Sequence, residues 1–197
     1  MRRPSIKILL WIALSLFALT GAMAGESLAV TGDVRKDPAA VVKAYFSLDM
    51  KGARLEAGSW EALKPYVDWE EEPAWEHAVV IEGYEVVEDT ATWEVLGQME
   101  VIIPVKFRVS GVMYWETAAF VPEAKVEEFR ILVKVVEGRW RIIEPRLAPH
   151  IGRARMVKFV RLALLQESDT GRKAKLTTLL NKLRQTEVKP TEIKKEP

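Results

Sequence analysis

The side chains best suited to chemistry in this sequence are few and widely spaced. There are two histidines, His77 and His150, and no cysteine, so thiolate chemistry and a disulfide framework are excluded. No pair of acidic side chains stands at ligand spacing to either histidine, so we expect neither a metal nor a cofactor. The simpler interpretation is structural: His77 begins a strand, and His150 caps the turn before a helix.

An acidic run between residues 68 and 76 is bracketed by tryptophans. Trp60 precedes this run, whereas Trp69 and Trp75 lie within it. Aromatic rings beside carboxylates suit a glycan or a basic peptide, because the flat faces stack and the acids pair with donors. Tryptophans also seal loops over a core, which is the simpler role. The sequence leaves both roles open.

Charge is distributed unevenly along the chain. Residues 25–149 hold 14 basic and 23 acidic side chains, whereas residues 150–197 hold 12 basic and 5 acidic ones. Arg155, Lys158 and Arg161 step along the polar side of a helix expected near the C-terminus. These cations suit anionic lipid, an acidic protein or the acidic body of the chain itself. No nucleic-acid partner is expected, because aromatic side chains are nearly absent among them.

Apolar spacing of three to four residues predicts helices at both ends of the globular part. Asp37-Pro38 opens the first helix, with Asp37 as its cap, and Gly52 ends it. A short second helix starts at Ser59 and is brief or broken because of Pro65. Two more helices are expected over residues 151–166 and 170–185, the latter with a leucine stripe that docks on the body of the protein.

From residue 78 onward apolar side chains recur at every second position, which predicts the strands of an antiparallel sheet. Between residues 91 and 109 we expect one long strand with its odd-numbered face buried, bent near Gly97 or interrupted at Pro104. Glu137-Gly138 is the expected turn of a closing hairpin. The other strands are expected over residues 79–87, 112–120, 129–136 and 139–143.

Two segments resemble a known fold. They are Asp37-Pro38, Val41-Val42 and Tyr45-Phe46 in the first helix, and Glu137-Gly138-Arg139-Trp140-Arg141-Ile142 in the closing hairpin. With them, residues 37–147 resemble the NTF2-like superfamily, the α+β cone shared by nuclear transport factor 2, ketosteroid isomerase and polyketide cyclases. The resemblance implies a curved antiparallel sheet wrapped around the N-terminal helices, with a pocket at its open end. A basic helical hairpin over residues 148–186 departs from that pattern.

The resemblance also implies candidate catalytic residues. Enzymes of this superfamily place a carboxylate or histidine base in an apolar pocket, opposite hydroxyl donors. Glu116 is the carboxylate that best suits this role, with Tyr45 or Tyr114 as the donor. The structural alternative is a solvated strand glutamate beside a core tyrosine.

The first 24 residues have the pattern of a signal peptide. A basic start, an apolar stretch from residue 8 to residue 19 and Ala22-Met23-Ala24 predict cleavage before Gly25. We therefore expect a periplasmic or secreted protein, resembling uncharacterised exported bacterial proteins, with a linker over residues 25–36. An uncleaved anchor in the inner membrane is the alternative. Residues 187–197 are expected to be disordered.

These features favour an exported, non-catalytic binding or accessory domain of the cell envelope. Its expected partners are another envelope protein, or a small apolar ligand in a pocket whose candidate residues are Trp93, Phe107 and Trp140. A second copy could bind through the outer sheet face, where Leu96 and Ile102 interrupt polar positions. The alternatives are a small pocket enzyme of isomerase, dehydratase or cyclase type, and a membrane-peripheral module that acts through the basic helices.

Overall fold

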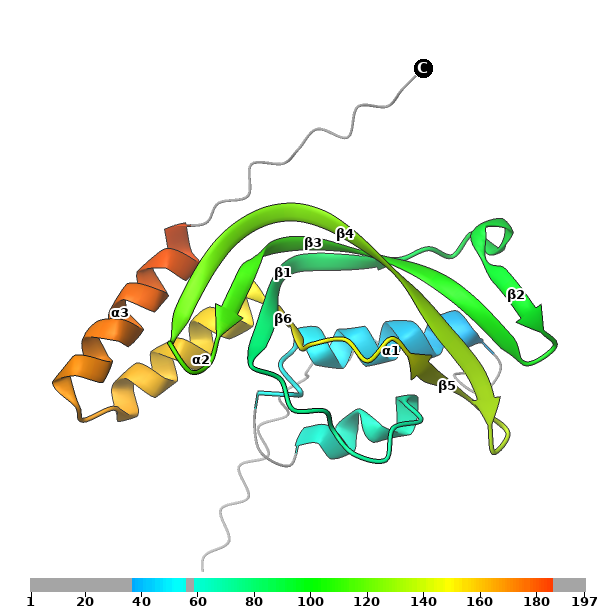
Figure 1. Ribbon diagram of the computed structural model, residues 1–197, viewed down its shortest axis with the longest axis horizontal. Coiled ribbons are helices and arrows are strands. Elements are labelled where there is room, and N and C mark those ends of the chain that lie inside the picture. The colour runs from blue at the N-terminus through cyan, green and yellow to red at the C-terminus, as the bar shows by residue number, and fades with distance from the viewer. Residues whose placement is uncertain (1–36, 56–58, 186–197) are drawn as a thin grey trace, which may run out of the picture.

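The computed structural model describes residues 37–55 and 59–185. A six-stranded, strongly curled sheet arches over one helix, and two C-terminal helices lie beside one end of it (Figure 1). The α+β class predicted from the sequence is therefore confirmed. The expected leader, linker and disordered tail fall outside the described residues.

The sheet is almost entirely antiparallel. Its strands are β1 (His77–Val86), β2 (Glu94–Gly97), β3 (Glu100–Tyr114), β4 (Ala119–Val136), β5 (Arg139–Glu144) and β6 (His150–Gly152). Their order is β5-β4-β3-β1-β6, and β2 pairs with the part of β3 that β1 leaves free. β6, which runs parallel to β1, was not predicted. β6 has only three residues, which is too few to show the alternation of apolar and polar side chains that identifies a strand. The sheet therefore extends past residue 147, the boundary expected from the sequence.

Helix α1 (Pro38–Met50) lies under the arch of the sheet (Figure 1). Its start is the predicted one: the Asp37 carboxylate accepts a hydrogen bond from the backbone N–H of Ala39 at 2.9 Å. Phe46 packs edge-on against Phe107 of β3, with ring centroids 4.9 Å apart. The sheet therefore packs around the side of α1 that the sequence pattern indicated.

The inward-facing rows of β3 and β4 form the centre of the main apolar core. Val101 lies opposite Val133, and Ile103 lies opposite Ile131. All four side chains are at most 5% exposed. Because alternate residues of a strand point to the same face, these two rows bury one side of the sheet against α1. We call this region the closed end.

The prediction of a single long strand over residues 91–109 is wrong. That segment contains a 3-10 turn, η3 (Thr90–Thr92), then β2, and the chain reverses at residues 98 and 99 before β3 begins. The odd-numbered face is buried from Val101 to Val109, but Val95 and Met99 are 70% and 59% exposed. Buried and exposed side chains alternate in both strands of a hairpin, so the alternation alone does not reveal that the chain reverses between β2 and β3. Pro104 stays inside β3.

Two other expected elements differ from the structure. The strand expected over residues 112–120 contains the turn at residues 115–118 that joins β3 to β4. The helix expected from Ser59 is two short 3-10 pieces, η1 (Ser59–Ala62) and η2 (Lys64–Tyr66). The closing hairpin turn is as predicted, with φ of 51° at Glu137 and 75° at Gly138.

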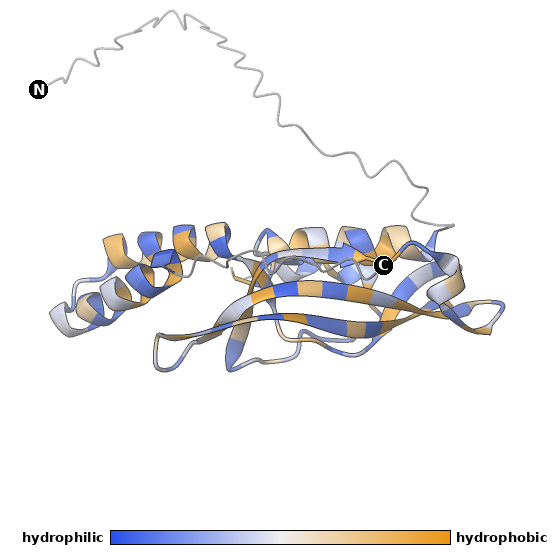
Figure 2. Cartoon of the chain, turned by 90° about the horizontal axis from the view of Figure 1, so that it is seen from above, coloured by the Kyte–Doolittle hydropathy of each residue, from blue (hydrophilic) through white to orange (hydrophobic). Residues whose placement is uncertain are grey.

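Helices α2 (Arg153–Gln166) and α3 (Thr170–Gln185) form the expected C-terminal hairpin. Leu179, Leu180 and Leu183 of α3 are at most 6% exposed and belong to a second apolar cluster with Met113 and Phe120 of the sheet. The predicted docking of the leucine stripe is therefore observed. Figure 2 shows both helices at one end of the molecule, and the alternating hydropathy of the strands.

None of the helices in residues 37–55 and 59–185 is long and apolar enough to cross a membrane.

Candidate functional site

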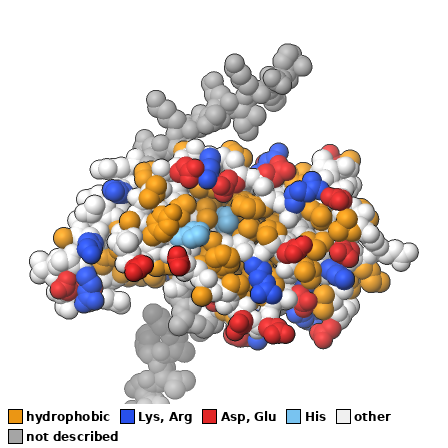
Figure 3. All heavy atoms as spheres, in the orientation of Figure 1, with side chains coloured by type: hydrophobic (Ala, Val, Ile, Leu, Met, Phe, Trp, Pro, Cys, Tyr) orange, Lys and Arg blue, Asp and Glu red, His pale blue; other side chains and the backbone are white. Residues whose placement is uncertain are grey.

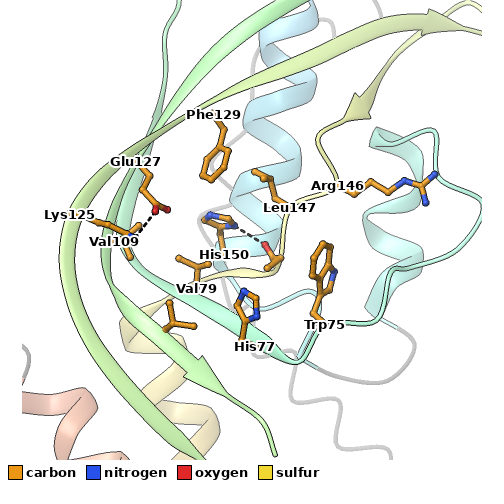
Figure 4. Close-up of a pocket in the computed structure, with 12 residues that line it drawn as sticks. Trp75, His77, Val79, Val109, Lys125, Glu127, Phe129, Arg146, Leu147 and His150 are labelled. Atoms are coloured by element: carbon orange, nitrogen blue, oxygen red, sulfur yellow. Dashed lines mark hydrogen bonds and ion pairs between the residues drawn. The ribbon is translucent and has the colours of Figure 1, made fainter.

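A cavity of about 350 Å³ lies on the inner side of the sheet, further along β3 and β4 from the closed end. Its walls come from β1, β3, β4 and the segment between β5 and β6 (Figure 4). Val79, Val109, Phe129 and Leu147 give it an apolar surface. We call it the open-end cavity.

The open-end cavity exists because the inward row of β4 changes character along the strand. Ile131 continues the apolar row of the closed end, Phe129 is half-buried, and Glu127 and Lys125 follow at alternate positions. The Lys125 ammonium lies 2.8 Å from the Glu127 carboxylate. Charged side chains at these positions stay solvated, so the sheet cannot close here as it does around Ile131.

His150 forms part of the cavity wall and is only 2% exposed. Its Nδ1 atom lies 2.7 Å from the carbonyl oxygen of Ala148, and its ring centroid lies 4.3 Å from that of Phe107. Burial lowers the pKa of His150, an effect that the nearby Asp49 carboxylate partly offsets. The imidazole is therefore neutral at pH 7, and its Nε2 atom has no hydrogen-bond partner in the described residues.

A buried ion pair holds His150 in place. The Arg54 guanidinium donates to both carboxylate oxygens of Asp49, at 2.8 Å and 2.6 Å. The same guanidinium donates to the backbone oxygens of Leu147 and Ala148, at 2.8 Å and 3.1 Å. Asp49 in turn accepts the backbone N–H of His150 at 2.9 Å. We call this set of bonds the Arg54–Asp49 clamp.

Two more residues with polar groups line the cavity where the chain enters β1. His77 begins β1, as predicted, is half-buried and lies with its ring 5.9 Å from that of Tyr114. The indole N–H of Trp75 is buried and has no partner among the described residues. Figure 3 shows the histidine side chains together on one face, among hydrophobic side chains. His150 does not cap a turn, as the sequence suggested, but starts β6.

The structure does not bring together the candidate catalytic set. Glu116 is an exposed residue in the turn between β3 and β4, and Tyr114 is 42% exposed. Tyr45 is buried in the core, where burial raises its pKa and its hydroxyl has no partner in the described part of the chain. Glu116 therefore lies in solvent and not in the apolar pocket that this role requires.

The candidate ligand-pocket residues belong to the main apolar core or pack against it. Phe107 is fully buried behind His150. Trp93 and Trp140 are half-buried, and the Trp93 indole donates to the backbone oxygen of Val87 at 2.7 Å. None of the three lines the open-end cavity.

The candidate interaction residues separate into different environments. Trp69 is 4% exposed, stacks on Trp60 and donates to the backbone oxygen of Ile143 at 2.9 Å, so it seals the core. Trp75 instead lines the open-end cavity. Lys158 and Arg161 are exposed on α2. Arg155 is half-buried, and its guanidinium donates to the backbone oxygen of Lys51 at 3.1 Å.

The outer sheet face, where a dimer contact was expected, carries cross-strand ion pairs. Lys106 pairs with Glu128 at 3.9 Å and Lys134 with Glu100 at 3.7 Å, and Arg130 pairs with Glu94. Leu96 is 51% exposed, and Ile102 is half-buried between these pairs.

The sequence patterns above do not predict the Arg54–Asp49 clamp, although the position of Asp49 in its helix points to a buried partner. Asp49 lies seven residues after Val42 and four after Tyr45, so it falls on the buried stripe of α1, where an unpaired carboxylate would be costly. Its partner Arg54 lies beyond the helix end, and no local spacing rule joins the two residues.

In residues 37–55 and 59–185, no group of three or more acidic, histidine or cysteine side chains could hold a metal ion. Comparisons with known protein families, curated proteins and solved structures found no match to this chain.

Proposed function

We propose that this protein is an exported, non-catalytic binding domain of the cell envelope, of NTF2-like type, and that it takes a small apolar ligand in the open-end cavity. One observation carries the binding proposal. His150 lines a cavity of about 350 Å³, and its buried Nε2 atom has no hydrogen-bond partner in the described residues. An unpaired buried polar atom costs free energy that a ligand can recover.

The size and surface of the cavity support a small ligand. Its volume lies near the lower end of the range of about 300–1,000 Å³ that is typical of small-molecule sites. Its floor is formed by buried residues such as Val109 and Leu147, whereas Lys125 and Arg146 are exposed at its edge. Apolar walls with few polar groups favour a mainly hydrophobic molecule.

The binding proposal is tested with a neutral fluorescent probe, N-phenyl-1-naphthylamine. Val79 lines the cavity, and replacing it by tryptophan fills part of the space. Val126, which is 66% exposed on β4, provides the matched control. We expect the probe to bind the unchanged protein and Val126→Trp alike, and Val79→Trp about tenfold more weakly or not at all. Equal binding to Val79→Trp, or no binding to any of the three proteins, would contradict the proposal.

The export part of the proposal has a separate test. Expressed as the full chain in a bacterial host, the protein should reach the periplasm with a mass that corresponds to a start at Gly25. Recovery in the membrane fraction at full mass would instead support the anchored alternative.

A small pocket enzyme is the second candidate, with His150 in place of Glu116 as the base. The neutral imidazole, whose Nε2 atom is unpaired within residues 37–55 and 59–185, favours it, because such a nitrogen can accept a proton from a substrate that reaches it. Turnover of a ketosteroid or lactone panel that is lost in His150→Leu would support the enzyme. Binding without turnover would support the binding domain.

A further inference from the structure

Strand β4 has a long free edge. On one side it pairs with β3 from residue 119 to residue 134. On the other side β5 pairs only with residues 132–136, and Figure 1 shows β5 beside that end of β4 alone. Within residues 37–55 and 59–185, no strand pairs with the outer edge of residues 119–131. The backbone N–H and C=O groups along this edge are therefore open to another strand.

The side chains along this edge are open to solvent as well. All six residues from Val121 to Val126 are exposed. Val121 and Val126, two β-branched residues suited to a paired strand, are 52% and 66% exposed. An edge of this kind is a template for β-augmentation, in which an added strand continues the ladder of hydrogen bonds.

The charges on the edge limit which strand can be added. Glu123, Lys125 and Glu127 stand at alternate positions, and the Lys125 ammonium lies 3.0 Å and 2.8 Å from the two carboxylates. Pro122 precedes them and has no N–H to donate to a ladder. Charges and a proline deter pairing with most extended chains. A strand with the complementary order of charges is not deterred, and a second copy of β4 in antiparallel orientation has that order.

Symmetry restricts how two such edges can meet. Two copies that pair edge to edge in antiparallel fashion are related by a two-fold axis perpendicular to the sheet. Opposed residues then lie on the same face and differ by an even number of positions. Registers centred on Glu123, Lys125 or Glu127 place that residue opposite its own copy, so like charges meet and repel.

Two registers bring opposite charges together. The register centred on Ala124 places Lys125 opposite the partner's Glu123, but it also puts Pro122 inside the ladder. The register centred on Val126 places Lys125 opposite the partner's Glu127, and does so twice by symmetry. In this second register the ladder spans residues 123–129, and Pro122 lies beyond its end.

We propose that two copies of this chain pair through residues 123–129 of β4, antiparallel and centred on Val126, so that their sheets become one. This contact uses the edge of the sheet rather than its outer face, and it goes beyond the proposed function. Lys125 and Glu127 line the open-end cavity, so the two cavities lie side by side on one face of the joined sheet. Val126 lies on the other face, opposite Arg108, and keeps that face exposed.

Cysteine cross-linking measures the register, because the chain has no cysteine of its own. Val126→Cys places two thiols opposite each other with Cα atoms about 4.5–5.5 Å apart, a span that a disulfide bridges. We expect this variant to form a covalent dimer on mild oxidation. Two copies of Ala124→Cys would hold their Cα atoms about 14 Å apart along the strands, which is too far for a disulfide.

Ala124→Cys mixed with Glu128→Cys should cross-link, because the register places these two positions opposite each other. Cross-linking of Ala124→Cys alone, with none in Val126→Cys, would overturn the register. Absence of any cross-link in all three experiments would overturn the pairing itself.

Charge reversal identifies the partner as a second copy. Lys125→Glu leaves only acidic side chains at positions 125 and 127, and Glu127→Lys leaves only basic ones. Each variant alone should remain monomeric at concentrations where the unchanged protein is dimeric. Mixed together they should form a heterodimer, because every acidic side chain then faces a basic one. Arg161→Glu, which reverses an exposed charge on α2, is the matched control and should dimerise like the unchanged protein.

Native mass spectrometry and sedimentation of the full chain give the readouts. A dimer of the unchanged protein that is lost in both single variants and restored in their mixture would support the pairing. A mixture that stays monomeric would overturn it, as would dimers of Lys125→Glu that are as stable as those of the unchanged protein. An unchanged protein that is monomeric up to about 1 mM would also overturn it.

Discussion

The closed end and the open-end cavity are built from the same two strands, yet the inner faces of these strands differ in character at the two ends. At the closed end Ile103 and Ile131 face each other and are fully buried. Further along, Phe107 pairs with Glu127 and Val109 with Lys125, so that one side of each pair is apolar and the other charged. The change from apolar to charged residues along β4 therefore separates the hydrophobic core from the open-end cavity.

The difference between the two ends shows how the fold keeps an open cavity beside a dry core. The inner face of the closed end is packed by apolar side chains, whose contacts need no precise partners. The open-end cavity needs a fixed polar scaffold, which the Arg54–Asp49 clamp supplies through five hydrogen bonds to defined atoms. Stability is thus shared between the ends, but the geometry of the site depends on the clamp.

The largest expected effect comes from breaking the clamp with Arg54→Met. This change leaves the buried Asp49 carboxylate without a counter-charge, so we expect the free energy of unfolding to fall by about 3–5 kcal/mol. Denaturant titration measures it. The double variant Asp49→Leu, Arg54→Met should regain most of the loss, because it removes both charges. A single variant as stable as the double one would show that the pair is not desolvated.

A smaller effect is expected from Ile131→Ala at the closed end. Deleting buried methyl and methylene groups should lower the free energy of unfolding by about 2–5 kcal/mol. Binding of N-phenyl-1-naphthylamine should change less than twofold at a temperature where the variant is folded, because Ile131 does not line the cavity. Val126→Ala, an exposed position on the same strand, should alter stability by at most about 0.5 kcal/mol. Loss of probe binding in Ile131→Ala would mean that the two ends are not independent.

The elements of the closed end could largely be predicted from the sequence. The Asp37 cap, the apolar stripe of α1, the odd-numbered row from Val101 to Val109 and the Glu137-Gly138 turn are local patterns. Local patterns record backbone geometry and burial within a few residues, and the structure follows them. The reversal at residues 98 and 99 is not predicted, because buried and exposed side chains continue to alternate through both strands of a hairpin.

The site could not be predicted in the same way, because it is made by contacts between distant parts of the chain. Arg54 reaches the Leu147 oxygen across 93 positions, and Asp49 reaches the His150 N–H across 101. His150 stands out in the sequence as one of two histidines, but its buried environment depends on a three-residue strand that is too short to show an alternating pattern. Its strand neighbour Tyr114 makes Glu116 a candidate in the sequence, but the turn at residues 115–118 places Glu116 in solvent.

The smallest expected effect is a dependence of stability on pH that arises at the open end alone. Burial holds the pKa of His150 below 6.5, its ordinary value, against the opposing charges of Asp49 and Glu127 and together with the repulsion of Arg54. Below pH 6.5 the unfolded chain therefore takes up a proton that the folded chain refuses. Stability from this group is complete above pH 6.5 and is lost as the pH falls, by at most about 1.4 kcal/mol per pH unit.

Denaturant titrations between pH 7.5 and 5.5 separate this effect from those of other groups, since exposed carboxylates titrate mainly below that range. His77→Leu should keep the decline, because His77 is half-buried at the rim, and His150→Leu should flatten it even if its overall stability is lower. A decline of equal size in His150→Leu would place its origin elsewhere and remove the argument that this imidazole is held neutral. A decline that disappears only in His150→Leu would assign the pH dependence to the clamped histidine, and thus to the end of the sheet that carries the site rather than the end that carries the core.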